Sequence, residues 1–156
     1  MRNDVSNGAI RFFTQDHRDC DDLWAQVEAA VQAKDDAKAK AAWLSFDKAM
    51  RAHFAMEEEV LFPAFEKATG MTGGPTAMMR MEHTQMRGVL DQMSSDANNG
   101  DFESVADHGD TLLMLIQQHN VKEENILYPM TEQHLAASWA GLASQLEPMY
   151  QASRQG

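Results

Sequence analysis

The chain has 156 residues, 44% of them apolar, and a formal net charge of −11 at pH 7. This length and composition fit one globular domain with a sizeable core, so we expect a single domain over residues 1–156. The acidic balance argues against a nucleic-acid or anionic-membrane surface, because both recruit Lys and Arg. Cys20 is the single cysteine, which excludes an intrachain disulfide and favours a reducing compartment. Because the sequence has neither a secretory-signal pattern nor a run long enough to span a membrane, we predict a cytoplasmic protein.

Helical periodicity of apolar residues predicts an all-α fold with four long helices, at about residues 9–33, 36–68, 76–95 and 102–133. The first inward stripe reads Phe13, His17, Cys20, Trp24, Val27 and Val31, and the other faces take Asp16, Asp19, Asp21 and Asp22. The fourth stripe reads Phe102, Val105, Leu112, Ile116, His119, Glu123, Ile126 and Leu127. Pro63 and Pro129 fall late in the second and fourth helices, where we expect a bend or loosened turns.

A fifth helix is expected at about residues 138–152, with Ser138 as a plausible N-cap. Its apolar residues are Trp139, Leu142 and Leu146, and Pro148 predicts a bend or its end. This segment has no counterpart in the first half of the chain, so we expect it to cover one side or end of the bundle.

An internal repeat carries the most informative residues. The first copy reads His53, Glu57, Glu58, Leu61, Phe62 and Pro63. The second copy, 66 positions later, reads His119, Glu123, Glu124, Leu127, Tyr128 and Pro129. His17 and His83 are related by the same shift, which indicates a duplication.

Helix geometry brings the repeated residues together. Residues four apart lie on one face of a helix, so each His-x-x-x-Glu pair points in one direction. The stretch from His17 to His53 suits a helical hairpin with legs of about 24 Å, which returns to the starting level, and His83 to His119 makes a second one. Two such hairpins packed face to face bring all six residues to one layer of a four-helix bundle, where bundle proteins build metal sites.

The site residues predicted to bind metal are His17, His53, Glu57, His83, His119 and Glu123. A single His-x-x-x-Glu pair is usually a solvated helix face, but four His and two Glu on apolar stripes would be costly to bury without partners. Imidazole with carboxylate suits iron, zinc, copper or manganese, and the lack of thiolates argues against a structural zinc motif. Two carboxylates among four imidazoles suit two metals bridged by both carboxylates.

The same six residues resemble those of the hemerythrin-like, or HHE cation-binding, domains, over about residues 10–133. The resemblance implies an up-down-up-down four-helix bundle with a non-haem di-iron centre and a bridging oxo or hydroxo group. It implies that His17 and His53 bind one iron, that His83 and His119 bind the other, and that Glu57 and Glu123 bridge them. Ferritin-like proteins use Glu-x-x-His instead, a motif absent from this sequence.

The sequence departs from oxygen-carrying hemerythrins at two positions. Those proteins have a fifth His where this chain has Arg87, and an Asp five residues after the last His, where this chain has Glu124. We interpret Arg87 as a partner of a bound anion or of Glu82, or as a solvent-exposed side chain. The His-x-x-x-Glu form is that of the HHE branch, which includes proteins linked to nitric-oxide stress and iron–sulfur repair.

Three functions follow as hypotheses. The first is the binding of O₂ or a related small ligand for storage, delivery or sensing, which makes the protein a metal- and ligand-binding protein more than a classical enzyme. The second is a redox or stress protein that handles NO or peroxide or donates iron. The third is a simple metal-binding or storage module, for which the site should be closed to azide.

Other residues are weaker candidates. Cys20 suits either a thiol behind the metal site or a small core residue, and Tyr128 is placed to hydrogen-bond a bridging carboxylate. Glu58 and Glu124 are expected behind the ligands or on the surface, with Glu124 an alternative ligand. His108 and His134 have no partner in the repeat and are expected on the surface. Four methionines are expected near the metal layer, namely Met50, Met56, Met86 and Met114.

Overall fold

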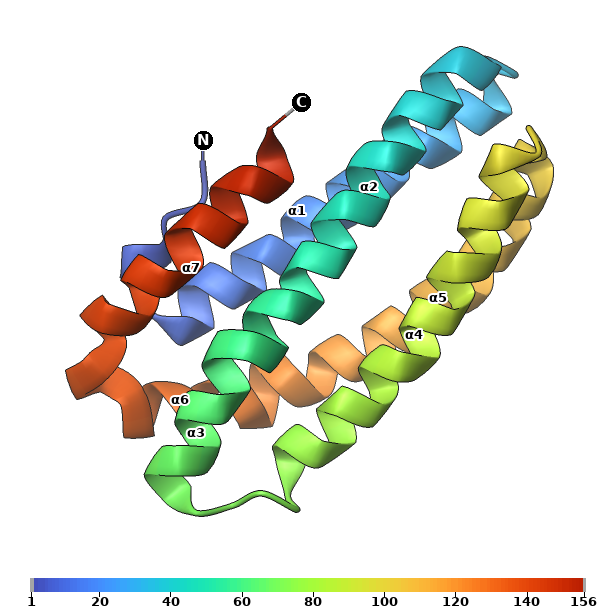
Figure 1. The fold of residues 1–156 in the computed structure, drawn as a ribbon. Coiled ribbons are helices and arrows are strands. Elements are labelled where there is room, and N and C mark those ends of the chain that lie inside the picture. The colour runs from blue at the N-terminus through green and yellow to red at the C-terminus, as the bar shows by residue number, and fades with distance from the viewer. Residues whose placement is uncertain (1, 156) are drawn as a thin grey trace.

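The chain folds into two helical hairpins that pack into one bundle (Figure 1). The computed structural model describes residues 2–155. Helices α1 (Ala9–Gln32) and α2 (Asp36–Met56) form the first hairpin, and α4 (Pro75–Asn98) and α5 (Phe102–Lys122) form the second. No strand occurs among residues 2–155, so the predicted all-α bundle is confirmed.

Each hairpin continues into a π-helical turn and a short helix. The first half has η2 (Glu57–Leu61) and α3 (Phe62–Thr69), and the second half has η3 (Glu123–Leu127) and α6 (Tyr128–Leu135). Every helix bound of the first half, from α1 to α3, recurs 66 positions later in the second half. The structure therefore bears out the internal duplication predicted from the motifs.

The π turns explain how the two prolines are accommodated. Pro63 and Pro129 have no backbone N–H to donate, and a proline ring would clash with the carbonyl four residues before it in a regular α-helix. The N–H groups of Phe62 and Tyr128 instead donate to carbonyls five residues back, at Glu57 and Glu123. The expected disturbance is present, in the turn directly before each proline.

The extra residue of a π turn also changes which side chains face inward. Leu127 and Tyr128, at the end of the second π turn, are buried, whereas Ile126 within the turn is 56% exposed. The prediction that Ile126 lies in the core was wrong, because it extended the α-helical period through a turn that does not follow it.

The apolar core is divided into two clusters. One surrounds Phe12, Phe65 and Leu146 at the end of the bundle covered by α7, and the other surrounds Trp24, Phe46 and Leu90 toward the hairpin turns. Between the two clusters lies the layer of the repeated His and Glu residues.

The C-terminal helix α7 (Trp139–Arg154) follows a short turn, η4 (Ala136–Ser138), and packs against α2 and the N-terminal turn η1 (Val5–Asn7). It buries the three predicted residues Trp139, Leu142 and Leu146. The indole N–H of Trp139 donates to the Val5 carbonyl oxygen at 2.8 Å. Pro148 lies inside the helix and does not end it, which excludes one of the two predicted outcomes. Its side chain is exposed, so the carbonyl that lacks its N–H can face water.

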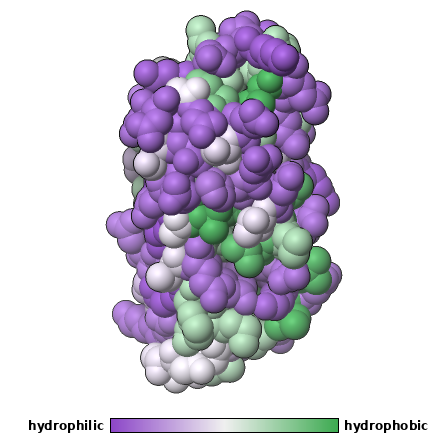
Figure 2. Space-filling model, turned by 90° about the vertical axis from the view of Figure 1, so that its right-hand side faces the viewer, coloured by the Kyte–Doolittle hydropathy of each residue, from purple (hydrophilic) through white to green (hydrophobic). Residues whose placement is uncertain are grey.

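The outer face of α4 and α5 is mainly hydrophilic, with interspersed hydrophobic residues (Figure 2). Its exposed large apolar side chains are Met78, Met81, Met114 and Val121. Among residues 2–155, no helix combines the length and the apolar character needed to cross a membrane.

At two positions of the repeat, a tryptophan in the first half is replaced by a smaller residue in the second half. The repeat aligns Trp24 with Leu90 and Trp43 with Gly109. A Cβ atom added to Gly109 would lie 2.1 Å from Cζ2 of Trp24. Gly109 therefore provides the space that the Trp24 indole occupies between α1 and α5.

We expect Gly109→Ala to lower the free energy of unfolding by about 1–3 kcal/mol, because the methyl group overlaps a buried ring. Denaturant unfolding of the metal-free protein measures the change. Gly88→Ala is the matched control, since Gly88 lies in α4 with nothing within 4 Å of an added Cβ. The control should gain roughly 0.5–1 kcal/mol from helix propensity. Equal effects of the two substitutions would contradict the packing assigned to Trp24.

Candidate metal centre

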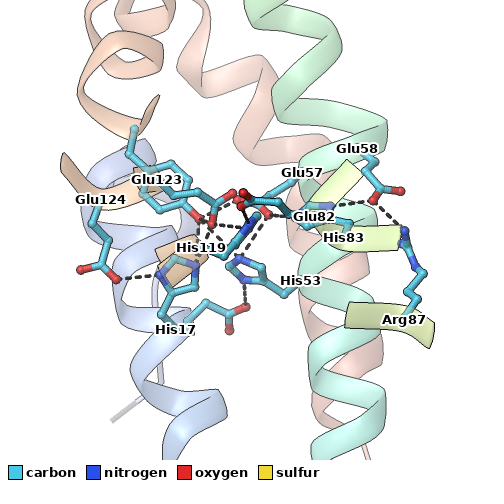
Figure 3. A network of polar contacts seen from close by, with 12 residues as sticks. His17, His53, Glu57, Glu58, Glu82, His83, Arg87, His119, Glu123 and Glu124 are labelled. Atoms are coloured by element: carbon cyan, nitrogen blue, oxygen red, sulfur yellow. Dashed lines mark hydrogen bonds and ion pairs between the residues drawn. The ribbon is translucent and has the colours of Figure 1, made fainter. Parts of the chain in front are cut away.

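The six repeated side chains converge in the middle of the bundle (Figure 3). They come from six different elements, and none is more than 5% exposed. Their ligand atoms form two groups, in each of which all atoms lie within 4.8 Å of one another. The first group is His17, His53, Glu57 and Glu123, and the second is Glu57, His83, His119 and Glu123.

The two glutamates belong to both groups and connect them. Oε1 of Glu57 lies 3.4 Å from His53 Nε2 and 3.0 Å from His83 Nε2. Oε1 of Glu123 lies 3.0 Å from His17 Nε2 and 3.2 Å from His119 Nε2. Each carboxylate thus contacts one imidazole of each group, as a carboxylate shared by two cations would.

Several buried atoms of this layer have no hydrogen-bond partner among residues 2–155. They are Glu57 Oε1, His83 Nε2, His119 Nε2 and Glu123 Oε2. Although Glu57 Oε1 and His83 Nε2 lie 3.0 Å apart, this contact lacks hydrogen-bond geometry. Unpartnered buried polar atoms are costly, and a bound cation would satisfy all four. The donor set of imidazole nitrogens and carboxylate oxygens therefore fits a metal pair.

An outer shell of four carboxylates contacts the other nitrogen, Nδ1, of each imidazole. The four pairs, with Nδ1–oxygen distances of 2.6–2.8 Å, are His17 with Glu124, His53 with Asp16, His83 with Glu58 and His119 with Glu82. An Nδ1–H that donates to a carboxylate leaves Nε2 free to bind a metal and fixes the orientation of the ring.

This shell obeys the same repeat as the inner residues. Asp16 and Glu82 are 66 positions apart, as are Glu58 and Glu124. Glu58 and Glu124 were expected behind the ligands or on the surface, and the structure places both against an imidazole. The sequence interpretation missed Glu82 as a histidine partner and wrongly assigned Asp16 to an outer face, since Asp16 is fully buried. The shared offset was the signal that could have found them.

Arg87 pairs with Glu58 rather than with Glu82. Its Nη1 donates to Glu58 Oε2 at 2.7 Å, and its guanidinium lies 5.3 Å from the centre of the Phe54 ring. Glu82 instead accepts from Lys122 Nζ at 2.5 Å. The position of the fifth His in oxygen carriers is thus occupied by an arginine that supports the carboxylate behind His83.

The surroundings of the two imidazole pairs differ at one repeat position. The Tyr128 hydroxyl lies 2.6 Å from Glu57 Oε2 and 2.9 Å from Glu123 Oε1, and burial raises the pKa of its phenol, which therefore stays a donor. The expected hydrogen bond from Tyr128 to a shared carboxylate is present. The equivalent residue of the first half, Phe62, stacks on His83 with 5.7 Å between ring centres.

A small cavity of about 10 Å³ adjoins the layer on the side of the hairpin turns. Both imidazoles of the first group line it together with Cys20, Met50 and Met86. This volume is close to that of one ordered water, so the space suits a ligand of very few atoms. Met114 was wrongly expected near the layer, since it is 60% exposed on the outer face of α5.

The remaining histidines lie outside the layer, as expected. The His108 side chain is 43% exposed and pairs with Asp96 at 2.7 Å. His134 is exposed and lies near the Met130 carbonyl oxygen.

The protonation of the metal-free layer follows from its carboxylates. Burial opposes ionisation of His119, but the charge and hydrogen bond of Glu123, with Glu57 and Glu82, raise its pKa to about 9. Burial likewise opposes ionisation of His53, yet Glu57 and Asp16 hold its pKa well above the usual value. Burial acts against ionisation of Glu57 as well, but the neighbouring imidazoles hold its pKa well below the usual value. Without metal, the neighbouring carboxylates therefore favour the protonated forms of His53 and His119.

Fold and site together define a class, that of helical bundles with a buried layer of His and Glu able to hold metal ions. The family model described as the hemerythrin HHE cation binding domain matches residues 8–131. The chain belongs to this family, and the predicted resemblance is confirmed. Searches of curated proteins and of solved structures each returned no match.

We expect the metal-free protein to lose stability as pH rises from about 6.5 to 9. An imidazole with a raised folded pKa stabilises fully below its unfolded pKa, near 6.5, and this contribution is lost through the folded pKa, about 9 for His119. The loss should be on the order of 3 kcal/mol for His119. Denaturant unfolding at several pH values measures it, and metal-loaded protein is the control, since bound metal replaces the protons. A metal-free stability that rises over this pH range would contradict the assignment.

Proposed function

We propose that this protein holds two non-haem iron ions with a bridging oxo or hydroxo group, and that it binds O₂ or a related small ligand for storage, delivery or sensing. In this proposal His17 and His53 bind one iron, His83 and His119 bind the other, and Glu57 and Glu123 bridge the two. The observation that carries the proposal is the pair of buried His₂Glu₂ groups that share both glutamates.

The number of protein donors supports a site that is open to a ligand. Each group offers two imidazole nitrogens and one oxygen from each glutamate, which makes four donors. Iron prefers six ligands, so a bridging group still leaves one position free on each ion. Bound iron supplies that free position and the change of oxidation state with which O₂, NO or peroxide can interact.

The residues of the chain orient and shield this position. The carboxylates behind the imidazoles keep Nε2 directed inward. The Tyr128 hydroxyl donates a hydrogen bond to a shared carboxylate. The apolar walls from Met50 and Met86 limit the adjoining cavity to about 10 Å³, which favours ligands of very few atoms over larger substrates.

A second candidate function is redox chemistry on NO or peroxide, or iron donation under stress. Arg87, which pairs with Glu58, leaves the two groups with equal donor sets because it supplies no fifth imidazole. Equal sets leave both ions open, whereas an oxygen carrier with a fifth His has one saturated ion. A stable O₂ adduct favours the first function, and turnover of NO or peroxide favours the second.

A cytoplasmic location is part of the proposal and is supported by one feature. Cys20 is the single cysteine of the chain and is buried without a disulfide partner. Such a residue is compatible with a reducing compartment.

The first test is metal content with the optical spectrum of air-purified protein, before and after azide. We expect two irons per chain, near-ultraviolet absorption from a bridged pair and a new band with azide, because each ion has a free position. Zinc, or one metal with no azide response, would leave only the third hypothesis, a metal-binding or storage module.

Glu57→Ala and Glu123→Ala should each lose one or both metals, because each carboxylate serves two ions. Metal analysis after gel filtration measures the loss. His108→Ala is the control and should keep two metals, since His108 pairs with Asp96 away from the layer. Two metals per chain in both glutamate variants would refute the bridging assignment.

A further inference from the structure

The four carboxylates behind the imidazoles are not equally exposed to water. The side chains of Glu58, Glu82 and Glu124 are 20–32% exposed. The Asp16 side chain, which accepts from His53 Nδ1 at 2.7 Å, is 0% exposed. Water can solvate the other three carboxylates, whereas Asp16 depends on protein groups alone.

The repeat shows why Asp16 needs a cation from outside the bundle. Glu82, the equivalent of Asp16, pairs with Lys122 of α5. The position equivalent to Lys122 in the first half is Met56, which is fully buried. The first hairpin therefore carries no cation at the place where the second one does.

The missing cation comes from α7. Nη2 of Arg154 donates to Oδ1 of Asp16, while Oδ2 of Asp16 faces His53. The guanidinium also lies 4.8 Å from the centre of the Tyr150 ring, and Nη1 donates to the Ser153 hydroxyl at 2.7 Å. These contacts fix Arg154 at the end of a helix that lies beyond the residues matched by the family model.

We propose that Arg154 is a positioning residue, which acts through Asp16 to hold His53 and so sets the metal affinity of the His17–His53 group. The proposal rests on the proposed function, since it requires that this group binds metal. It assigns to α7 a role in the metal centre in addition to covering the core.

The contacts from Arg154 through Asp16 to His53 predict that loss of Arg154 weakens metal binding at one of the two groups. Without Arg154, the buried Asp16 carboxylate loses the one ion-pair partner, apart from His53, that residues 2–155 give it, and it is then free to turn away from the imidazole. His53 would lose the acceptor that orients its Nε2, whereas His83 and His119 keep Glu58 and Glu82. The loss of affinity should therefore be confined to one of the two metal ions.

The test is a Co²⁺ titration of the full-length metal-free protein against a chromophoric chelator, with cobalt absorption as a second readout. We expect Arg154→Met to weaken one of the two dissociation constants by about tenfold, the lower end of the effect of partners behind metal-binding His. Arg154→Lys should restore most of the affinity, because it returns the charge. Asp16→Asn should weaken the same site, and adding Arg154→Met to it should have little further effect.

Arg2→Met is the matched control. Arg2 also lies over the Tyr150 ring, at 5.6 Å, and pairs with Glu147 of α7, but within residues 2–155 no ion pair or hydrogen bond joins it to Asp16. Its two dissociation constants should be those of the unchanged protein. If Arg154→Met fails to fold, Arg154→Gln, which keeps the stem and a donor, replaces it in the same titration.

The outcomes separate the two proposals. Unchanged constants in the Arg154 variants, or equal weakening at both sites, would overturn the positioning role while leaving the metal pair intact. Failure of the unchanged protein to bind two Co²⁺ ions would instead overturn the proposed function.

Discussion

Two glutamate carboxylates with no exposure to water lie in the middle of the bundle, and much of the surrounding structure compensates their buried negative charges. A buried carboxylate is costly unless cations or donors surround it. Glu57 and Glu123 have four imidazoles and the Tyr128 hydroxyl around them. The imidazoles in turn require acceptors for Nδ1, which the outer shell of carboxylates supplies. The imidazoles therefore compensate the two inner glutamates, and the outer carboxylates compensate the imidazoles.

The duplication supplies this arrangement twice, and the departures from it make the two halves chemically different. Tyr128 replaces Phe62 in the second copy, so a hydroxyl reaches the shared carboxylates from one side only. His83 is flanked instead by aromatic faces, with Phe54 at 4.3 Å and Phe62 at 5.7 Å between ring centres. Two sites with the same donor atoms thus have different polarity around them, which is the property that would let a small ligand distinguish one from the other.

The sequence predicted the helices and the six converging residues because both depend on spacing alone. A 3.6-residue period locates a buried stripe, and one shared offset relates His17 to His83 and Glu57 to Glu123. Spacing did not predict the burial of a residue whose partner lies outside the repeat, or the exposure of a residue in a turn that departs from the α-helical period. Asp16 looks like one of several acidic residues on the face of a helix, but its buried carboxylate is paired with His53 and with the distant Arg154. Ile126 lies within a π turn, so its direction cannot be extrapolated from His119 and Glu123.

The π turns connect these observations to the motif itself. In each copy the π turn starts at the glutamate that faces the layer, and the next residue, a second glutamate, accepts from an imidazole on another helix. Consecutive side chains on a helix diverge by about 100°, so one can face the interior while the other spans the groove to the neighbouring helix. The proline that closes each copy disfavours a regular α-helical turn just after these glutamates. The Glu-Glu pair and the proline six positions after the first glutamate therefore act together, and each repeat encodes an inner carboxylate, an outer carboxylate and the turn that carries them.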